Sequence, residues 1–201
     1  RGLGDVYKRQ IPGPTTDEAW ATTAVMEKEV MEYFLHNAGD PNGVIEGGII
    51  VFAAGNEYSP MAGYPGAYKD FISVASIGPD GTPAPYSNYG TPTGSRNMIT
   101  APGGDGEGTK RERALVLSTM PMSAVDMGGD ATKGGYGYME GTSMACPHVS
   151  GVAALGLSYA AKLRKHFRAE DYRRLLLESV KPFTFKYDDY KSYWYGWAMF
   201  G

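Results

Sequence analysis

Hydrophobic residues near the start of the chain recur at the spacing of an α-helix. Thr15 precedes Glu18 by three positions, which is the spacing of a capping box at a helix N-terminus. Behind this box, apolar residues follow one another three and four positions apart: Met26, Val30, Tyr33 and Phe34. Asn37-Ala38-Gly39 then has the composition of a helix C-terminus. The pattern therefore predicts a helix between the capping box and this stop.

Short apolar runs further along the chain predict buried strands. They cover residues 47–52, 71–75 and 97–100, and the last two are followed by Gly/Pro turns. Two more helices are predicted, a long one rich in Ala, Leu and Val from 143 to about 167, and a shorter amphipathic one over 169–180. Because a helix followed by a buried strand is typical of a parallel sheet, we expect an α/β fold with a mainly parallel sheet flanked by helices.

Composition narrows the classes of function. The 201 residues are 42% apolar and 20% charged, which is enough for one packed domain, and the net charge of −3 gives no basic field for nucleic acid. No apolar run approaches the roughly 18 residues of a membrane span. The single cysteine, Cys146, excludes an internal disulfide and a cysteine-based zinc cluster. Glycine is enriched, and a Gly-rich excursion covers 103–137 with a short apolar piece at 114–117.

The two ends differ from the rest of the chain. Residues 1–10 show no helical or strand period, and we interpret them as a non-native leader. Residues 11–182 are then a partial domain, and residues 183–201 an aromatic-rich C-terminal segment that we expect to be truncated. We expect this segment to pack back on a larger body, with a carbohydrate or partner platform as the alternative. Its aromatic residues are Phe183, Phe185, Tyr187, Tyr190, Tyr193, Trp194, Tyr195, Trp197 and Phe200.

The segment 141–151 carries the most informative chemistry. Ser143 stands where a Gly-Thr turn enters the long helix, close to unpaired backbone N–H groups and the positive end of the helix dipole. Such a position favours negative charge on a carbonyl oxygen during acyl transfer. A serine that merely caps a core helix is the simpler interpretation of the first turn alone.

The whole string Gly141-Thr142-Ser143-Met144-Ala145-Cys146-Pro147-His148-Val149-Ser150-Gly151 resembles the serine motif G-T-S-M-A-x-P-H-V-x-G of the subtilase family, the subtilisin-like serine peptidases. Further stretches resemble that family in the right order, and the resemblance covers about 17–180. They are Val51-Phe52-Ala53-Ala54-Gly55-Asn56, Tyr64-Pro65-Gly66-Ala67-Tyr68, Tyr86-Ser87-Asn88-Tyr89-Gly90 (family pattern F-S-N-x-G) and Ala101-Pro102-Gly103. The resemblance implies the three-layer subtilisin-like fold with its N-terminal strands missing.

The resemblance also implies roles for individual residues. Ser143 would be the nucleophile, and the Asn56 side-chain amide together with the Ser143 backbone N–H would hold the oxyanion. The substrate-binding positions would be Ala54, Gly55, Gly63, Gly141 and Thr142, the first three of them lining the pocket for the side chain before the cut. Glu140 departs from the pattern, because many relatives have a small polar residue there.

A serine nucleophile needs a general base and an orienting carboxylate, and the chain offers no suitable histidine. In this family His precedes Ser by roughly 157 residues, so counting back from Ser143 passes residue 1. His148 lies five residues after Ser143 on the same helix, where the family string has a packing residue, and His36 and His166 stand at helix ends. We therefore expect the Asp and His of the catalytic triad to lie upstream of this segment, and we expect the isolated segment not to hydrolyse peptides at enzymatic rates. Without the first strands of the parallel sheet, the segment should expose an apolar sheet edge and aggregate.

Other classes fit less well. An α/β-hydrolase would need an apolar strand before the serine, and a nucleotide-binding domain would need a phosphate-cradling glycine loop after 49–52. A catalytically inactive, subtilase-like binding module remains an alternative. The resemblance implies a peptide or protein substrate, a secreted or envelope location and no cofactor; calcium binds many relatives. The acidic residues outside the motifs are expected to be solvated loop charges: Asp105, Glu107, Asp126, Asp130, Asp188 and Asp189.

Overall fold

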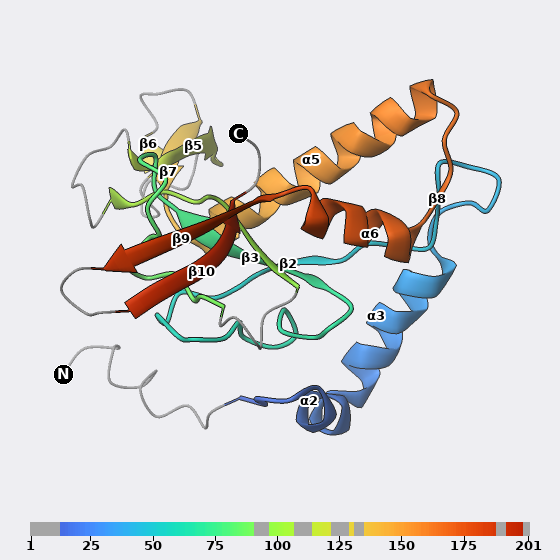
Figure 1. The fold of residues 1–201 in the computed structure, drawn as a ribbon, viewed down its shortest axis with the longest axis horizontal. Helices are drawn as coiled ribbons and strands as arrows, with labels where there is room; N and C mark the ends of the chain where they lie inside the picture. Colours follow the sequence, from blue (N-terminus) through green and yellow to red (C-terminus); the bar gives the residue numbers. More distant parts are fainter. Residues whose placement is uncertain are drawn as a thin grey trace.

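The computed structural model describes residues 13–90, 97–106, 114–121, 129–130, 135–187 and 192–198. Its centre is a sheet in the order β2-β3-β4-β10-β9, in which β2 (Val51–Ala53), β3 (Ile72–Ile77) and β4 (Met98–Pro102) are parallel (Figure 1). Each of these strands falls on one of the three predicted apolar runs, with bounds shifted by a few residues. The expected leader at 1–10 lies outside the described residues.

The far edge of the sheet comes from the C-terminal part of the chain. Strands β9 (Lys181–Tyr187) and β10 (Ser192–Ala198) form an antiparallel hairpin. Strand β10 pairs with β4 in parallel through Ala198 and Thr100. The backbone of the aromatic-rich segment therefore extends the central sheet, while residues 188–191 and 199–201 lie outside the described part.

Helix α5 (Thr142–Lys162) crosses one face of the sheet and packs on β2, β3 and β4 (Figure 1). Its apolar side joins the shorter helix α6 (Ala169–Glu178) in one core. The fully or almost fully buried members of that core include Ile72, Val74, Ile99, Ala145, Val149 and Leu176. Helix α5 ends five residues before the predicted end, because residues 167–168 form the strand β8 (Phe167–Arg168), which pairs with β1 (Ile45–Glu46).

The N-terminal helical region consists of two helices where the sequence predicts one. Helix α2 (Asp17–Thr23) begins at Thr16, whose hydroxyl accepts a hydrogen bond from the Ala19 N–H, so the cap is Thr16 and not Thr15. The helical conformation is interrupted at Ala24, and α3 (Val25–Asn37) follows. Thr22 and Thr23 donate their hydroxyls to carbonyls one turn back, a local bond that weakens helix continuation.

The apolar residues whose spacing predicted a helix here lie on the solvent side of α3. Met26 is 81% exposed and Tyr33 71% exposed, and Val30 and Phe34 are exposed as well. Met31 and Leu35 pack against an aromatic cluster built on Trp20 and Phe71. The spacing therefore indicated the helix but not its buried side.

The Gly-rich excursion contains a small antiparallel sheet in the order β5-β7-β6: β5 (Val116–Thr119), β6 (Gly129–Asp130) and β7 (Tyr136–Met139). Strand β7 leads directly into Gly141 and α5. Asp105 in this excursion is 6% exposed, which corrects the expectation of a solvated loop charge. Glu107, Asp126, Asp188 and Asp189 lie outside the described residues, and of Asp130 only the strand is described.

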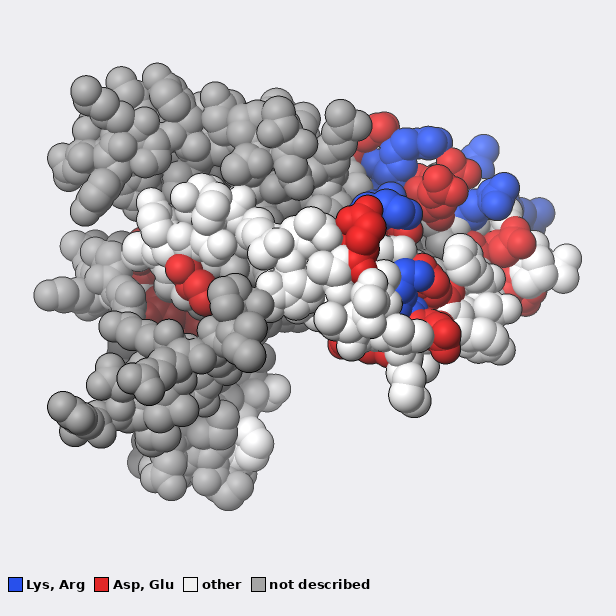
Figure 2. Space-filling view, turned by 90° about the horizontal axis from the view of Figure 1, so that it is seen from below, with Lys and Arg blue, Asp and Glu red and all other residues white. Residues whose placement is uncertain are grey.

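Surface charges of both signs lie close together. Figure 2 shows Lys, Arg, Asp and Glu intermixed at the end of this face where α3 and α6 lie in Figure 1. This arrangement fits the net charge of −3. In the described part of the chain no helix is long and apolar enough to cross a membrane.

Candidate active site

The turn between β7 and α5 presents Ser143. Gly141 has φ 144°, a conformation that suits glycine, and its carbonyl accepts the N–H groups of Met144 at 2.9 Å and Ala145 at 3.3 Å. Ser143 is the second residue of the helix and its side chain is exposed. The Ser143 N–H donates to none of the described residues. The serine thus lies at the surface beside a backbone donor without an acceptor.

Asn56 reaches this turn from the end of β2. Gly55, with φ 104°, allows the chain to reverse after the strand. The Asn56 Oδ1 accepts two hydrogen bonds from Thr142, from the backbone N–H at 3.0 Å and from the hydroxyl at 2.9 Å. The Thr142 hydroxyl in turn accepts from the Gly55 N–H at 3.1 Å. These bonds identify Oδ1 and leave Nδ2 directed away from Thr142.

Asn56 and Ser143 each bring a hydrogen-bond donor to this turn. The Asn56 Nδ2 lies close to the nucleophile turn, 3.5 Å from where a Cβ on Gly141 would stand. No described residue accepts from Nδ2 or from the Ser143 N–H. Both donors also stand at the N-terminus of a 21-residue helix, whose dipole favours negative charge. An oxygen that becomes negative beside Ser143 can therefore be stabilised by preorganised donors.

Asn88 is a buried residue beside the candidate site, and the sequence motifs assigned it no role. It is 2% exposed, and its Oδ1 accepts from the N–H groups of Glu57 at 3.0 Å and Ser59 at 2.9 Å. Its Nδ2 donates to the Ala54 carbonyl at 2.9 Å and to the Glu57 carboxylate at 2.8 Å. The side chain therefore fixes both flanks of Asn56. Its place in the Y-S-N-Y-G stretch was the only signal in the sequence.

The residues predicted to bind substrate lie on both sides of Asn56. Ala54 and Thr142 have no exposed surface, so they shape the site through the backbone and through the hold on Asn56. Gly63 is exposed, and its N–H donates to the Ala54 carbonyl at 2.9 Å, which brings the 54–56 turn and the 63–67 turn together. Gly55 and Gly141 flank the Asn56 amide. The role of these five residues in substrate binding stays a prediction.

Among the described residues, none of the three histidines forms a hydrogen bond with Ser143. The His148 ring bonds the Met144 carbonyl of its own helix at 2.9 Å and is exposed, whereas the family string had indicated a packing residue. The His166 ring bonds the Gly43 carbonyl at 2.8 Å, beside Glu46. His36 lies exposed in the last turn of α3. That the general base is not among them stays a prediction.

Cys146 offers no alternative nucleophile. Its thiol is half-buried and donates to the Val51 carbonyl at 3.5 Å. Burial raises the pKa of this thiol, which disfavours the reactive thiolate. Within the ranges that the structure describes, no three His, Cys, Asp or Glu side chains come together as a metal site.

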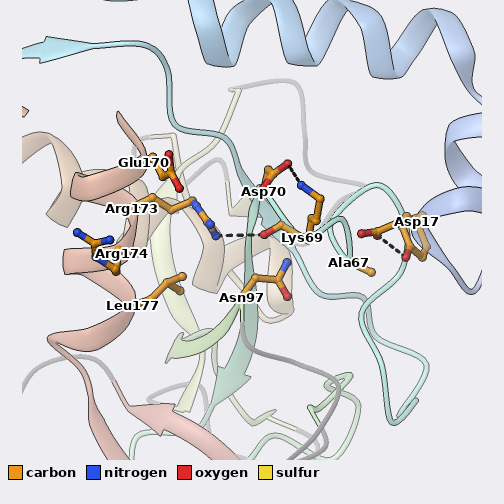
Figure 3. Close-up of a pocket in the computed structure, with 10 residues that line it drawn as sticks. Asp17, Ala67, Lys69, Asp70, Asn97, Glu170, Arg173, Arg174 and Leu177 are labelled. Carbon is orange, nitrogen blue, oxygen red and sulfur yellow. Dashed lines mark hydrogen bonds and ion pairs between the residues drawn. The ribbon is translucent and has the colours of Figure 1, made fainter. Parts of the chain in front are cut away.

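A cavity of about 580 Å³ lies between α6 and the 64–70 turn (Figure 3). Asn97 closes one side by donating its amide to three carbonyls, those of Gly66, Tyr68 and Phe71. Arg173 bonds the Lys69 carbonyl, and Lys69 pairs with Asp70. None of the residues around Ser143 and Asn56 lines this cavity, so it is separate from the candidate active site.

Comparisons with known proteins agree with the geometry. The model of the subtilase family matches residues 9–197. The extracellular basic protease of Dichelobacter nodosus is 34% identical over 144 residues, which cover 71% of this chain and 21% of that protein. Subtilisin E of Bacillus subtilis (strain 168) is 32% identical over 158 residues, 77% of this chain and 31% of that protein. The chain thus spans less than a third of the length of either relative.

Solved structures show the same fold. A lanthipeptide protease matches with a TM-score of 0.60 at 26% identity, over 84% of this chain and half of that one. The prenylagaramide maturation protease PagA matches with a TM-score of 0.53 at 28% identity, over 67% of this chain and 41% of that one. The parallel sheet, the helix that begins at the serine and the family match lead to one conclusion: the chain belongs to the subtilase family.

Proposed function

We propose that this chain provides the nucleophile and the oxyanion hole of a subtilisin-like serine endopeptidase that acts on peptides or proteins. The observation that carries the proposal is the double hydrogen bond from Thr142 to the Asn56 Oδ1, which turns Nδ2 toward the Ser143 turn. In this reaction the Ser143 Oγ attacks the scissile carbonyl carbon and loses its proton to a general base. The carbonyl oxygen becomes negative and accepts from the Asn56 Nδ2 and the Ser143 N–H.

The base and its orienting carboxylate would lie upstream of this segment in the parent protein. The contacts of the three histidines support this placement, and so does the greater length of the relatives. Strand β2 is the outer strand of the central sheet as far as the structure describes it, so further strands can pair along its free edge. The isolated segment is expected to be inactive and to associate through this edge.

The relatives also bear on location. One of them is described as an extracellular protease, and we infer that the parent protein works outside the cytoplasm or in the cell envelope. The proposed chemistry uses only side-chain and backbone groups of the protein, without a cofactor. Calcium binding, which the family resemblance implies for many relatives, has no residues assigned to it in this chain.

The test uses the full-length parent protein and a peptide-anilide substrate. Ser143→Ala should abolish turnover, while Ser150→Ala, which removes another exposed serine hydroxyl from the same helix, should leave it unchanged. Asn56→Leu should lower kcat by roughly 100- to 1,000-fold with little change in KM; that range is the one known for subtilisin itself, a member of this family. Peptide binding without turnover by the unaltered protein would instead indicate an inactive binding module.

A further inference from the structure

The segment 103–106, which follows β4, lies directly against the residues that precede Ser143. The Gly141 N–H donates to the Gly103 carbonyl at 2.9 Å. At the end of the segment, the Glu140 carboxylate accepts a hydrogen bond from the Gly106 N–H. Two hydrogen bonds therefore join the segment 103–106 to Glu140 and Gly141, which come shortly before Ser143.

Tyr86 holds the same segment from the other side. Its hydroxyl lies 2.6 Å from the Gly104 carbonyl and 3.1 Å from the Gly103 carbonyl, and the Ser76 hydroxyl lies 2.9 Å from it. The Gly103 carbonyl is thus shared between Tyr86 and the Gly141 N–H. A displacement of this carbonyl acts on both groups.

The Gly103 backbone packs closely against its neighbours. A Cβ at Gly103 would stand 2.1 Å from the Ser76 Oγ and 2.6 Å from the Gly141 carbonyl oxygen. Burial, together with the nearby Glu140 and Asp105, raises the pKa of Tyr86 to about 12. The hydroxyl is therefore a neutral donor over the working range of a peptidase.

Tyr86 and Glu140 lie far apart in the sequence and both bond the four-residue segment 103–106. Two side chains from different parts of the chain therefore hold the same segment.

We propose that Tyr86 and Glu140 are positioning residues for Ser143, which hold the 103–106 segment as a support for the nucleophile turn. The proposal rests on the proposed function of Ser143. Neither side chain contacts the reacting atoms. Their effect is to fix the Gly141 backbone, and with it the direction of the Ser143 Oγ and N–H.

The test measures kcat and KM of the full-length protein for Tyr86→Phe and Glu140→Ala. Each should lower kcat by about 10-fold and leave KM within about 2-fold, because a small misplacement of a catalytic group slows the chemical step. Glu140→Gln keeps an acceptor for the Gly106 N–H and should recover most of the lost kcat. The double variant Tyr86→Phe/Glu140→Ala should lose less than the product of the single losses, since both side chains act through one segment.

Tyr172→Phe is the matched control. It also removes a buried tyrosine hydroxyl that donates to a carbonyl, that of Ala153 at 2.7 Å on the same helix as Ser143. It should lower the melting temperature and leave kcat unchanged. Equal kcat values for Tyr86→Phe and Tyr172→Phe, or no recovery with Glu140→Gln, would overturn the inference while leaving the proposed function intact. Full activity of Ser143→Ala would overturn the proposed function itself.

Discussion

Thr142 gives both of its hydrogen-bond donors to one atom, the Oδ1 of Asn56, at 3.0 and 2.9 Å. The two residues are 86 positions apart in the sequence. Thr142 has no exposed surface, whereas Asn56 is exposed, so these two hydrogen bonds are partly buried. A donor that is fixed before the reaction needs no reorganisation when charge develops, and this is how such a site lowers the barrier.

Removal of the Thr142 hydroxyl should therefore weaken the oxyanion hole without touching its donors. Thr142→Val keeps the shape of the side chain but takes one bond from Asn56 and leaves the Gly55 N–H without its acceptor. We expect kcat of the full-length protein to fall by about 10-fold, which is less than the loss of a donor itself. Thr142→Ser keeps the hydroxyl and should retain most of the activity. Equal kcat values for the two variants would show that the hydroxyl does not orient Asn56.

Asn88 should be needed for stability as well as for rate. Asn88→Ala removes four hydrogen bonds at a buried position, and we expect the free energy of unfolding to fall by about 2–4 kcal/mol. Asn88→Asp should be at least as harmful, because an acceptor would then face the Ala54 carbonyl and the Glu57 carboxylate. Urea unfolding measures both. A loss below about 0.5 kcal/mol would mean that the turn around Asn56 is held by other contacts.

The two threonines before α2 provide a test of the helix start. Thr16→Ala should lower the free energy of unfolding by about 0.5–2 kcal/mol, because its hydroxyl accepts from the Ala19 N–H. Thr15→Ala is the control and should be nearly neutral. A larger loss of stability for Thr15→Ala than for Thr16→Ala would show that the helix is capped by Thr15, as the sequence alone indicated.

Glu32 should make stability depend on pH in the acid range. Its carboxylate accepts from Lys28 and, at 2.9 Å, from Tyr68, and these bonds lower the pKa of Glu32 below 4.5, the Lys28 bond contributing most. A lowered pKa in the folded state gives stability that is present above the unfolded pKa and is lost as the pH falls through the folded pKa.

The measurement is the melting temperature of Glu32→Gln from pH 6 down to about pH 3, beside that of Glu29→Gln on the same helix. The difference in melting temperature between Glu32→Gln and the unaltered protein should shrink as the pH falls, because protonation of Glu32 removes the same negative charge that the substitution removes. A gap that stays constant over this range would contradict the role of the Glu32 charge.

The sequence predicted the elements that supply the main hydrophobic core. Strands β2, β3 and β4 and helices α5 and α6 appear where the apolar runs placed them, because such runs have no other way to leave water. The regular apolar spacing in α3 does not mark its buried side, because Trp20 and Phe71, which are distant in the sequence, contact Met31 and Leu35. Strands β5 to β7 are short and have no clear period, and they were not predicted.

For the candidate site, the motifs indicated Ser143 and Asn56 but not the residues that hold them. Thr142 was assigned to substrate binding, which stays a prediction, and its buried hydroxyl bonds Asn56 and Gly55. The contacts of Asn88 and Tyr86 join segments that lie 10 to 34 residues away in the chain. Such hydrogen bonds leave no periodic trace in a sequence, so only the three-dimensional arrangement shows them.

In the proposed reaction, Ser143 is a nucleophile that attacks beside the Asn56 amide. The most direct measurement treats the full-length protein with a fluorophosphonate, which forms a bond to a reactive serine Oγ as fluoride leaves, and locates the adduct by peptide mass spectrometry. We predict one adduct, on the peptide that contains Ser143, absent in Ser143→Ala and formed more slowly in Asn56→Leu. Peptide hydrolysis by a protein whose Ser143 stays unmodified, or an adduct on another serine, would contradict the claim.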